Sequence, residues 1–262
     1  MSINAFKRYE MKFLLSKEQF DALLPKLLQY MNPDQNCKNG DSYNIYNIYY
    51  DTFDSSLIRT SLSKPLYKEK LRLRSYTIPN SLNSKVYLEL KKKTTGVVHK
   101  RRAAMTLKEA YEFIESGKKP VTKNYIGQQV INELEYFLSR YEVSPAAYIS
   151  YTRMAFFGKN DKDFRVTFDS NITTRRSELY LERGSFGEQL LESGQYIMEV
   201  KISRAVPIWL AEVLSELKIY KRSFSKYGKE YSYYCQNNLV SNFNRDFSSQ
   251  SEDPQALYTI SV

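Results

Sequence analysis

Apolar and charged residues alternate along much of this chain, and the alternation is clearest in residues 85–102. In the first half of this segment Val86, Leu88 and Leu90 alternate with a charged or polar set: Lys85, Tyr87, Glu89, Lys91 and Lys93. A period of two places the two sets on opposite faces of a β-strand. Residues 94–96 predict a turn, and residues 97–103 predict a second strand that returns beside the first. The segment therefore predicts a hairpin with one apolar and one charged face.

The same alternation recurs in four other segments, which are residues 9–13, 70–74, 164–169 and 197–202. A single charged strand face usually lies in solvent, but its recurrence in five segments indicates a shared arrangement. We predict an α+β fold in which an antiparallel β-barrel holds the charged faces inside and helices pack on the outside. Basic residues with a few carboxylates inside such a barrel would form a water-filled tunnel that binds anions.

Apolar residues spaced three and four positions apart predict helices between these strands. Ser16 and Gln19 form a capping box that opens one helix, and Thr106 and Glu109 form another. The second of these helices is expected to end near Gly117. The other expected elements are helices at residues 55–63, 128–141, 207–217 and 228–238 and strands at residues 5–15, 43–50 and 146–157.

The chain is expected to form one domain over residues 1–238, because no stretch within it has the composition of a linker. Ser, Asn, Gln and Asp dominate from Ser241 onward. Such a composition cannot bury much apolar surface. Residues 239–262 are therefore predicted to form a loosely ordered C-terminal tail.

The location of the protein is predicted from three absences. No apolar run approaches the ~18 residues that a membrane span needs. Residues 1–13 lack the apolar core of a signal peptide. Cys37 and Cys235 lie far apart without metal-type spacing, which fits a reducing compartment. We therefore expect a soluble, cytoplasmic protein.

The net charge of +10 at pH 7 implies an acidic partner, which could be nucleic acid, anionic lipid or a phosphorylated small molecule. The basic residues occupy alternating strand positions rather than a surface run, which favours the small phosphorylated ligand. His99 is the only histidine, which excludes a Ser-His-Asp triad and a histidine metal site. No GxxxxGKS/T or GxGxxG motif occurs, so a P-loop or Rossmann nucleotide site is not expected.

Cations that face one another inside a barrel have an energetic consequence. Two like charges ~5 Å apart repel by roughly 3 kcal/mol at an effective dielectric constant of ~20. The empty barrel would be destabilised unless carboxylates, water and a bound anion offset this repulsion. A linear tri- or polyphosphate has the required charge density. Arg72 and Arg74 could each bind two phosphate oxygens, and compact ammonium charges would come from Lys12, Lys91, Lys100 and Lys201.

Seven segments carry a resemblance to a known family: RYEMKF (8–13), KLRLR (70–74), YLELKKKTTGVVHKRR (87–102), YTRMAF (151–156), FRVTFD (164–169), IMEVKI (197–202) and SFSKYG (223–228). In content and order they resemble the VTC-domain polyphosphate polymerases, within the triphosphate tunnel metalloenzyme (CYTH-like) superfamily. No single segment is specific, but the ordered set is. The resemblance implies the triphosphate tunnel fold and an enzyme that transfers the γ-phosphate of ATP onto a growing inorganic polyphosphate chain.

The resemblance also implies roles for individual residues. Among the basic residues of these segments, the resemblance implies that Arg72, Arg74, Lys91, Arg153, Arg165 and Lys226 bind phosphate, with Lys12 and Lys201 beside them. Lys100 is expected to bind phosphate as well, because of its strand position. Of these, Arg72, Arg74 and Lys91 are expected to be catalytic. Glu199 is the expected ligand for Mn²⁺ or Mg²⁺, because hard cations are bound by carboxylate and phosphate oxygens together. Glu10 and Glu89 are further metal candidates, although both could instead hold neighbouring lysines in place.

One position departs from the hydrolase branch of the same superfamily. That branch begins with E-x-E-x-K, whereas residues 8–12 are R-Y-E-M-K, so Arg8 replaces the first glutamate. The loss of a metal carboxylate and the gain of a cation favour polymerase chemistry or binding over triphosphate hydrolysis. Two alternatives stay open. One is a tripolyphosphate or organic triphosphate hydrolase on the same fold, and the other is a non-catalytic sensor that binds polyphosphate.

The expected partners are ATP and inorganic polyphosphate. Nucleic acid is not expected, because the charges should face inward and no recognition motif is present. Eukaryotic members of the resembled family carry this domain beside an SPX module and membrane helices, neither of which occurs in this sequence. The chain is therefore not expected to enter a membrane itself, and a separately encoded membrane partner is a hypothesis.

Overall fold

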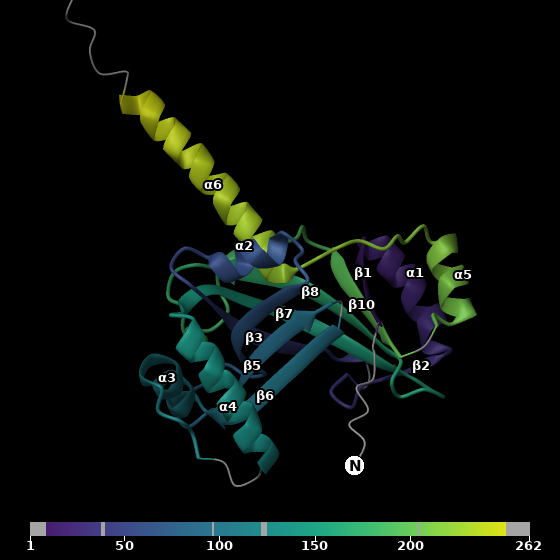
Figure 1. The fold of residues 1–262 in the computed structure, drawn as a ribbon. Coiled ribbons are helices and arrows are strands. Elements are labelled where there is room, and N and C mark those ends of the chain that lie inside the picture. Colours follow the sequence, from purple (N-terminus) through teal and green to yellow (C-terminus); the bar gives the residue numbers. More distant parts are fainter. Residues whose placement is uncertain (1–8, 38–39, 96, 122–124, 204, 250–262) are drawn as a thin grey trace, which may run out of the picture.

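The computed structural model describes residues 9–37, 40–95, 97–121, 125–203 and 205–249, and its main feature is one antiparallel sheet (Figure 1). The described strands are β1 (Tyr9–Leu15), β2 (Met31–Pro33), β3 (Tyr43–Asp51), β4 (Tyr67–Ser75), β5 (Lys85–Thr94), β6 (Val97–Thr106), β7 (Ser144–Gly158), β8 (Arg165–Arg175), β9 (Glu188–Gln189) and β10 (Tyr196–Ile202). The described helices are α1 (Lys17–Leu28), α2 (Ser56–Leu62), α3 (Leu107–Ser116), α4 (Tyr125–Arg140), α5 (Ile208–Glu216) and α6 (Lys226–Ser249). This mixture confirms the predicted α+β class.

The order of strands in the sheet differs from their order in the chain. The main path runs β1-β10-β8-β7-β3-β4-β5-β6, while β2 pairs with β7 and β9 pairs with β8. Strands from the two ends of the chain are therefore neighbours, because β1 pairs with β10 along its whole length. This pairing brings the first and the last of the charged segments together.

Both predicted capping boxes are present at the starts of α1 and α3. The Gln19 N–H donates to Ser16 Oγ at 3.2 Å, and the Ser16 N–H donates to Gln19 Oε1 at 3.1 Å. Thr106 and Glu109 make the same reciprocal pair, at 3.2 and 2.8 Å. Gly117 ends α3 with a φ of 74°, a left-handed conformation that glycine adopts without steric cost. These two helices begin where the sequence predicts.

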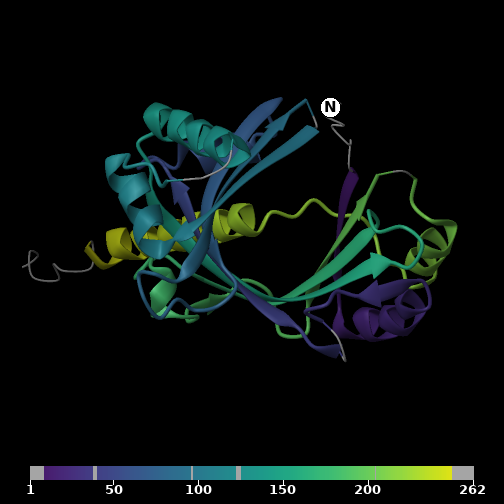
Figure 2. The same ribbon diagram turned by 90° about the horizontal axis from the view of Figure 1, so that it is seen from below.

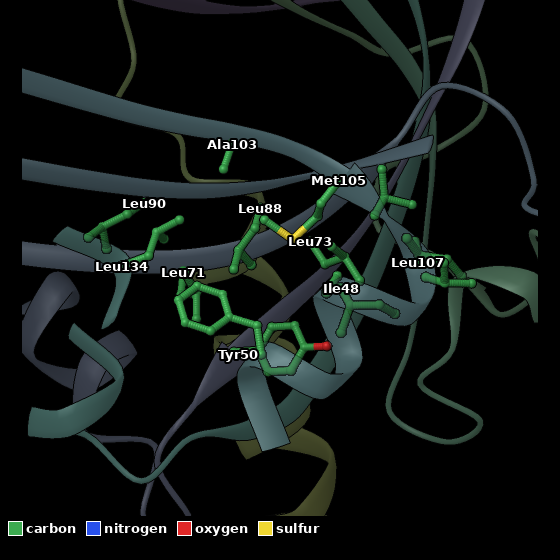
Figure 3. Close-up of a cluster of buried hydrophobic side chains, with 14 of the residues drawn as sticks. Ile48, Tyr50, Leu71, Leu73, Leu88, Leu90, Ala103, Met105, Leu107 and Leu134 are labelled. Atoms are coloured by element: carbon green, nitrogen blue, oxygen red, sulfur yellow. The ribbon is translucent and has the colours of Figure 1, made fainter. Parts of the chain in front are cut away.

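The apolar face of the sheet lies on its outer side, under the helices. Figure 3 shows part of one cluster, in which Leu71 and Leu73 from β4 and Leu88 and Leu90 from β5 pack near Leu134 of α4. All five side chains are fully buried, and each contributes about 1.5–3 kcal/mol of hydrophobic stabilisation. A second cluster packs α1 and α5 against β1, β8 and β10. The apolar faces therefore point outward, as predicted, and leave the charged faces inside.

The two edge strands of the sheet, β1 and β6, are not joined by hydrogen bonds within the described residues. The predicted barrel is therefore curled but not closed by strand pairing. Figure 2 shows the two arms of the curled sheet, one ending in β1 and the other in β6. The crossing segment, residues 217–225, runs between the two arms from α5 to α6. The Arg222 N–H donates to the carbonyl of Lys12 on β1 at 2.8 Å, and Lys70 Nζ on β4 donates to Ser225 Oγ at 3.1 Å. The crossing segment thus connects the two arms.

Several strands differ from their predicted bounds. The alternation predicts a strand over residues 164–169, whereas β8 continues to Arg175. Asn171 has a φ of 50°, and this kink interrupts the alternation that would reveal the second half of the strand. The short strands β2 and β9 carry too few residues to show a period and were not predicted. Residues 5–8 of the predicted first strand lie outside the described residues.

Helix α6 is longer than predicted, because it runs to Ser249 instead of ending near residue 238. Residues 239–249 are therefore helical where the composition predicts a loosely ordered tail. No Gly or Pro interrupts residues 229–249, so nothing in the backbone chemistry ends the helix earlier. Residues 250–262 lie outside the described residues, and the domain boundary at residue 238 stays a prediction. Among the helices of the described chain, none has both the length and the apolar composition needed to cross a bilayer.

Candidate functional site

A cavity of about 890 Å³ lies inside the curled sheet, and we call it the tunnel. It is lined by all the residues that the sequence assigns to phosphate or metal binding: Lys12, Arg72, Arg74, Lys91, Lys100, Arg153, Arg165, Lys201 and Lys226, with Glu10, Glu89 and Glu199. Two basic residues that were not assigned, Lys70 and Arg102, also line it. Both occupy the alternating positions of β4 and β6, so the period of two could have found them. The roles of all these residues as ligands stay predictions.

Among the described residues that line the tunnel, basic side chains outnumber carboxylates by eleven to three. Strands β4, β5 and β6 pair so that Lys91 on β5 lies directly opposite Lys70 on β4 and Lys100 on β6. We call these three residues the lysine row. Like charges at directly opposed strand positions destabilise a sheet, and an anion bound between them would remove this cost.

Glu89 is bound on all sides by cations of neighbouring strands. Arg72 Nε donates to Glu89 Oε2 at 2.7 Å, while Arg102 Nε and Lys100 Nζ contact Oε1 at 2.6 and 2.7 Å. Burial alone would raise the pKa of Glu89, but Arg72, Arg74 and Lys100 hold it well below its ordinary value. Because both oxygens are occupied, Glu89 is suited to ordering these cations. This geometry does not favour it as a metal ligand.

Asp169 on β8 anchors two of the predicted phosphate ligands from below the tunnel surface. The fully buried carboxylate accepts hydrogen bonds from Arg153 Nε and Nη2 at 2.6 and 2.7 Å, and it pairs with Lys226 Nζ. Burial would raise the pKa of Asp169, but Arg153 and Lys226 lower it. The sequence analysis did not assign Asp169. Its position two and four residues beyond Thr167 and Arg165, on the same strand face, is the signal that could have found it.

Besides their contacts with Glu89, Arg72 and Arg74 hydrogen-bond to neutral side chains of β3 and β7. Arg74 is 4% exposed, and it donates to Asn47 Oδ1 at 2.8 Å and to the Tyr151 hydroxyl at 2.9 Å. Arg72 Nη1 donates to the Tyr49 hydroxyl at 3.2 Å. Burial would raise the pKa of Tyr49, but the guanidinium of Arg72 lowers it below its ordinary value. Both arginines are therefore fixed in orientation before any ligand binds.

Glu10 and Glu199 make longer contacts with their neighbouring cations than Glu89 does, so they remain candidates for a metal site. Lys12 Nζ lies 3.3 Å from each of them, and Glu199 also lies 3.6 Å from Lys201 and from Lys226. Burial would raise the pKa of Glu199, but Lys226, Lys12 and Lys201 hold it well below its ordinary value. Within the described residues no group of three His, Cys, Asp or Glu is arranged to hold a metal. Two ionised carboxylates do fit Mg²⁺ or Mn²⁺ if phosphate oxygens and water complete the coordination.

The whole arrangement matches a known family. The family model of the VTC domain matches residues 7–235, which include every described strand and the entire tunnel lining. The chain belongs to the VTC domain family. Among curated protein sequences, none matches this VTC domain. Arg8, the residue that departs from the hydrolase pattern, falls within the match but outside the described residues.

Solved structures resemble this VTC domain in fold. A protein of Bacillus halodurans, named as a candidate adenylate cyclase, is similar with a TM-score of 0.50 and 16% identity, over 84% of this chain and 95% of that one. A Hippeastrum protein, named as a candidate adenylyl cyclase with a dominant triphosphatase activity, gives a TM-score of 0.48 and 18% identity, over 83% and 92% of the two chains. At these identities the first likeness shows a common fold, in agreement with the predicted tunnel fold.

Two residues of the lysine row should make anion binding in the tunnel of this VTC domain depend on pH, because burial lowers the pKa of both Lys70 and Lys100 to about 8. For Lys70, the ammonium groups of Lys91, Lys68 and Lys12 contribute to the decrease in pKa. Lys70 is therefore charged below pH 8 and loses its charge as the pH rises. An anion binds the charged form preferentially, so its affinity should be highest below the pKa and fall above it.

We expect the affinity for tripolyphosphate to decrease between pH 7.5 and pH 9.5, by at most about tenfold per pH unit for this one group. Lys70→Met keeps the aliphatic length and removes the charge, so its affinity should be lower at pH 7.5 and its pH profile flatter. Isothermal titration calorimetry across this range measures both profiles. Titration of the ligand itself affects the two proteins equally. Parallel profiles would therefore contradict the assignment to Lys70.

Proposed function

We propose that this VTC domain is a metal-dependent polyphosphate polymerase, which transfers the γ-phosphate of ATP onto the end of an inorganic polyphosphate chain in the tunnel. The observation that supports this function is the cationic lining of the tunnel, to which the described part of the chain contributes eleven basic side chains against three carboxylates. Few ligands other than a linear polyphosphate carry enough charge to offset it. Membership of the VTC domain family over residues 7–235 supports the same conclusion.

The proposed reaction balances without a protein nucleophile. A terminal oxygen of the bound polyphosphate attacks the γ-phosphorus of ATP and forms a new P–O–P bond. The bond between the γ-phosphorus and the β,γ-bridging oxygen breaks, and ADP leaves with that oxygen. The attacking oxygen is largely ionised near neutral pH, so no general base is required. Catalysis then consists of positioning and charge stabilisation.

Three basic residues are proposed to carry the catalysis. Arg72 and Arg74 bind non-bridging phosphate oxygens, and their fixed orientation reduces the ordering needed when the substrate arrives. Lys91, whose side chain is 45% exposed, contacts the transferring phosphate from the lysine row. A divalent cation held by Glu10 and Glu199 would, when bound, polarise phosphate oxygens and offset the charge of the leaving group.

The acceptor distinguishes this polymerase from a hydrolase, in which water would take the place of the polyphosphate chain. Arg8 in place of a glutamate supports the polymerase, since it leaves fewer carboxylates for a metal and adds a cation for a long anion. ATP as the phosphate donor and polyphosphate as the acceptor belong to this proposal. The separately encoded membrane partner stays a hypothesis from the family resemblance.

Incubation with ATP and either Mn²⁺ or Mg²⁺, followed by gel electrophoresis and staining for polyphosphate, tests the proposal. Long phosphate chains are expected, with one ADP for each phosphate added. Orthophosphate without chains would identify a hydrolase, and tight tripolyphosphate binding without either product would identify a sensor. Arg72→Ala should abolish chain synthesis. Arg59→Ala removes an exposed arginine that pairs with Asp54 on the surface, and it should leave synthesis unchanged.

Tripolyphosphate should stabilise the protein against heat, because it offsets the repulsion within the tunnel. A ligand at ~100 times its dissociation constant adds ~2.7 kcal/mol to the free energy of unfolding. For a domain of this size that corresponds to an increase of about 5–11 °C in melting temperature. Orthophosphate at the same concentration should give a smaller shift, since it can contact only one row of cations. Differential scanning fluorimetry compares the two, and equal shifts would speak against a tunnel that binds linear chains.

A further inference from the structure

The cationic inner face of β4 and β5 continues past the residues that line the tunnel. Side chains on one face of a strand recur at every second position. Lys68 therefore lies next to Lys70 on the same face of β4, and Lys93 lies next to Lys91 on the same face of β5. Lys68 and Lys93 lie directly opposite each other in the pairing of these strands. We call them the outer lysine pair. Neither lines the tunnel cavity, and the proposed reaction does not require them.

Carboxylates are distributed unevenly along this face. At the inner end, Glu89 offsets the charges of Arg72 and Arg102. Within the described residues, neither member of the outer lysine pair forms an ion pair, whereas their neighbours Lys91 and Lys92 do. Lys68 Nζ donates to the carbonyl of Ser61 at 2.9 Å, which uses one of its three N–H donors. As far as the described part of the chain extends, the outer end therefore carries positive charge without a matching carboxylate.

The ammonium groups at this end also repel one another. Burial lowers the pKa of Lys68, and the nearby charges of Lys93, Lys91 and Lys64 lower it further. Directly opposed like charges are unfavourable in a sheet. Two unpaired lysines at such a position are explained if an anion from outside the chain binds between them.

We propose that the outer lysine pair forms a second phosphate subsite, which binds the part of a polyphosphate chain that extends beyond the tunnel. The ligand in this inference rests on the proposed function. Positions two residues apart on a strand are ~6.6 Å apart, so ~13 Å separate Lys68 from Arg72. A tripolyphosphate bound at Arg72 and the lysine row is too short to reach the outer lysine pair, whereas a longer chain passes over it. The subsite therefore makes affinity depend on chain length.

The double variant Lys68→Gln/Lys93→Gln tests this subsite by calorimetric titration with polyphosphates of increasing defined length. In the unmodified protein, affinity should rise with length beyond tripolyphosphate. In the variant, tripolyphosphate should bind with less than about twofold change, while long chains should bind at least about tenfold more weakly. The retained tripolyphosphate affinity also shows that the variant is folded. Lys93→Gln alone leaves the hydrogen bond from Lys68 Nζ to the Ser61 carbonyl in place, and it should show part of the same effect.

Two further variants control for charge and position. Lys159→Gln/Lys162→Gln removes two charges from the turn between β7 and β8, outside the tunnel lining, and should change the affinity at no chain length. Lys68→Arg/Lys93→Arg retains both charges and should restore the preference for long chains. An unchanged length dependence in the glutamine variant would overturn the subsite, and so would an equal loss at every length. Because these titrations need no turnover, they remain decisive even if ATP yields no polyphosphate.

Discussion

Replacement of Asp169 by asparagine should destabilise the protein by about 3–5 kcal/mol, although the two side chains have almost the same shape. The carboxylate is fully buried and receives two hydrogen bonds from Arg153 and one contact from Lys226. Asparagine would remove the only carboxylate among the described residues that hydrogen-bonds to Arg153, would leave Lys226 with Glu199 at 3.6 Å, and would direct its own N–H donors at these buried cations. The melting temperature should fall by about 6–20 °C, which thermal and urea unfolding would measure.

Asp21→Asn is the matched control, because Asp21 pairs with Lys17 at 2.7 Å on the exposed surface of α1. Exposed pairs of this kind contribute at most about 1 kcal/mol. Tripolyphosphate should restore part of the stability lost by Asp169→Asn, since the uncompensated cations gain an anion. The pKa of Asp169 is lowered in the folded protein, so its contribution is present above the ordinary pKa of ~3.9 and declines as the pH falls below it. A decrease in the free energy of unfolding no larger than that of Asp21→Asn would show that the buried ion pairs of Asp169 stabilise the protein no more than an exposed pair does.

The positions of the tunnel residues could be predicted because strand alternation determines them. A shift of one residue moves a strand side chain to the opposite face of the sheet, so charged residues at every second position of a segment share one face whichever strands are its neighbours. Arg72 on β4, Arg165 on β8 and Lys201 on β10 all line the tunnel for this reason. The capping boxes were equally predictable, because a cap depends on residues three positions apart.

The partners of these residues could not be predicted in the same way. Glu89 is enclosed by cations because β5 lies between β4 and β6, and Glu199 contacts Lys12 because β10 pairs with β1. Such neighbours are far apart in the chain, and local periodicity carries no information on which strands pair. For the same reason, the sequence could not show that β1 and β6 remain unpaired edge strands within the described residues. The length of α6 was missed for a different reason, since its polar composition suggested disorder although no residue ends the helix.

The distinction between the three candidate metal carboxylates is also a result of these contacts. Glu89 has both oxygens bound by Arg72, Lys100 and Arg102. Glu10 and Glu199 both contact Lys12 at a longer distance of 3.3 Å. A divalent cation could take the place of Lys12 in these contacts or bind beside it. The sequence predicts that all three side chains face the tunnel. Only the pairing of the strands shows which of them is bound most closely by cations.

Glu199→Gln should reduce phosphoryl transfer by about a hundredfold or more without weakening the binding of metal-free tripolyphosphate. The side chain is 10% exposed and lies 3.3 Å from Lys12 and 3.6 Å from Lys201 and Lys226. Glutamine keeps its shape and removes a negative charge from a cationic tunnel, so the affinity for an anion should stay the same or increase. The affinity for Mn²⁺ should fall, because the proposed pair with Glu10 loses one carboxylate.

Three measurements distinguish a metal-binding role of Glu199 from a role in which it only neutralises neighbouring lysines. They are tripolyphosphate titration with a chelator present, Mn²⁺ binding followed by electron paramagnetic resonance, and transfer rates at saturating metal. Arg72→Ala should weaken tripolyphosphate binding and transfer together, since it contacts phosphate in the ground state and the transition state alike. Glu89→Gln should impair transfer while leaving the Mn²⁺ affinity intact. If Glu199 only neutralises Lys12, Lys201 and Lys226, its glutamine variant will bind Mn²⁺ normally and retain near-normal transfer at saturating metal, and the metal assignment will then be wrong.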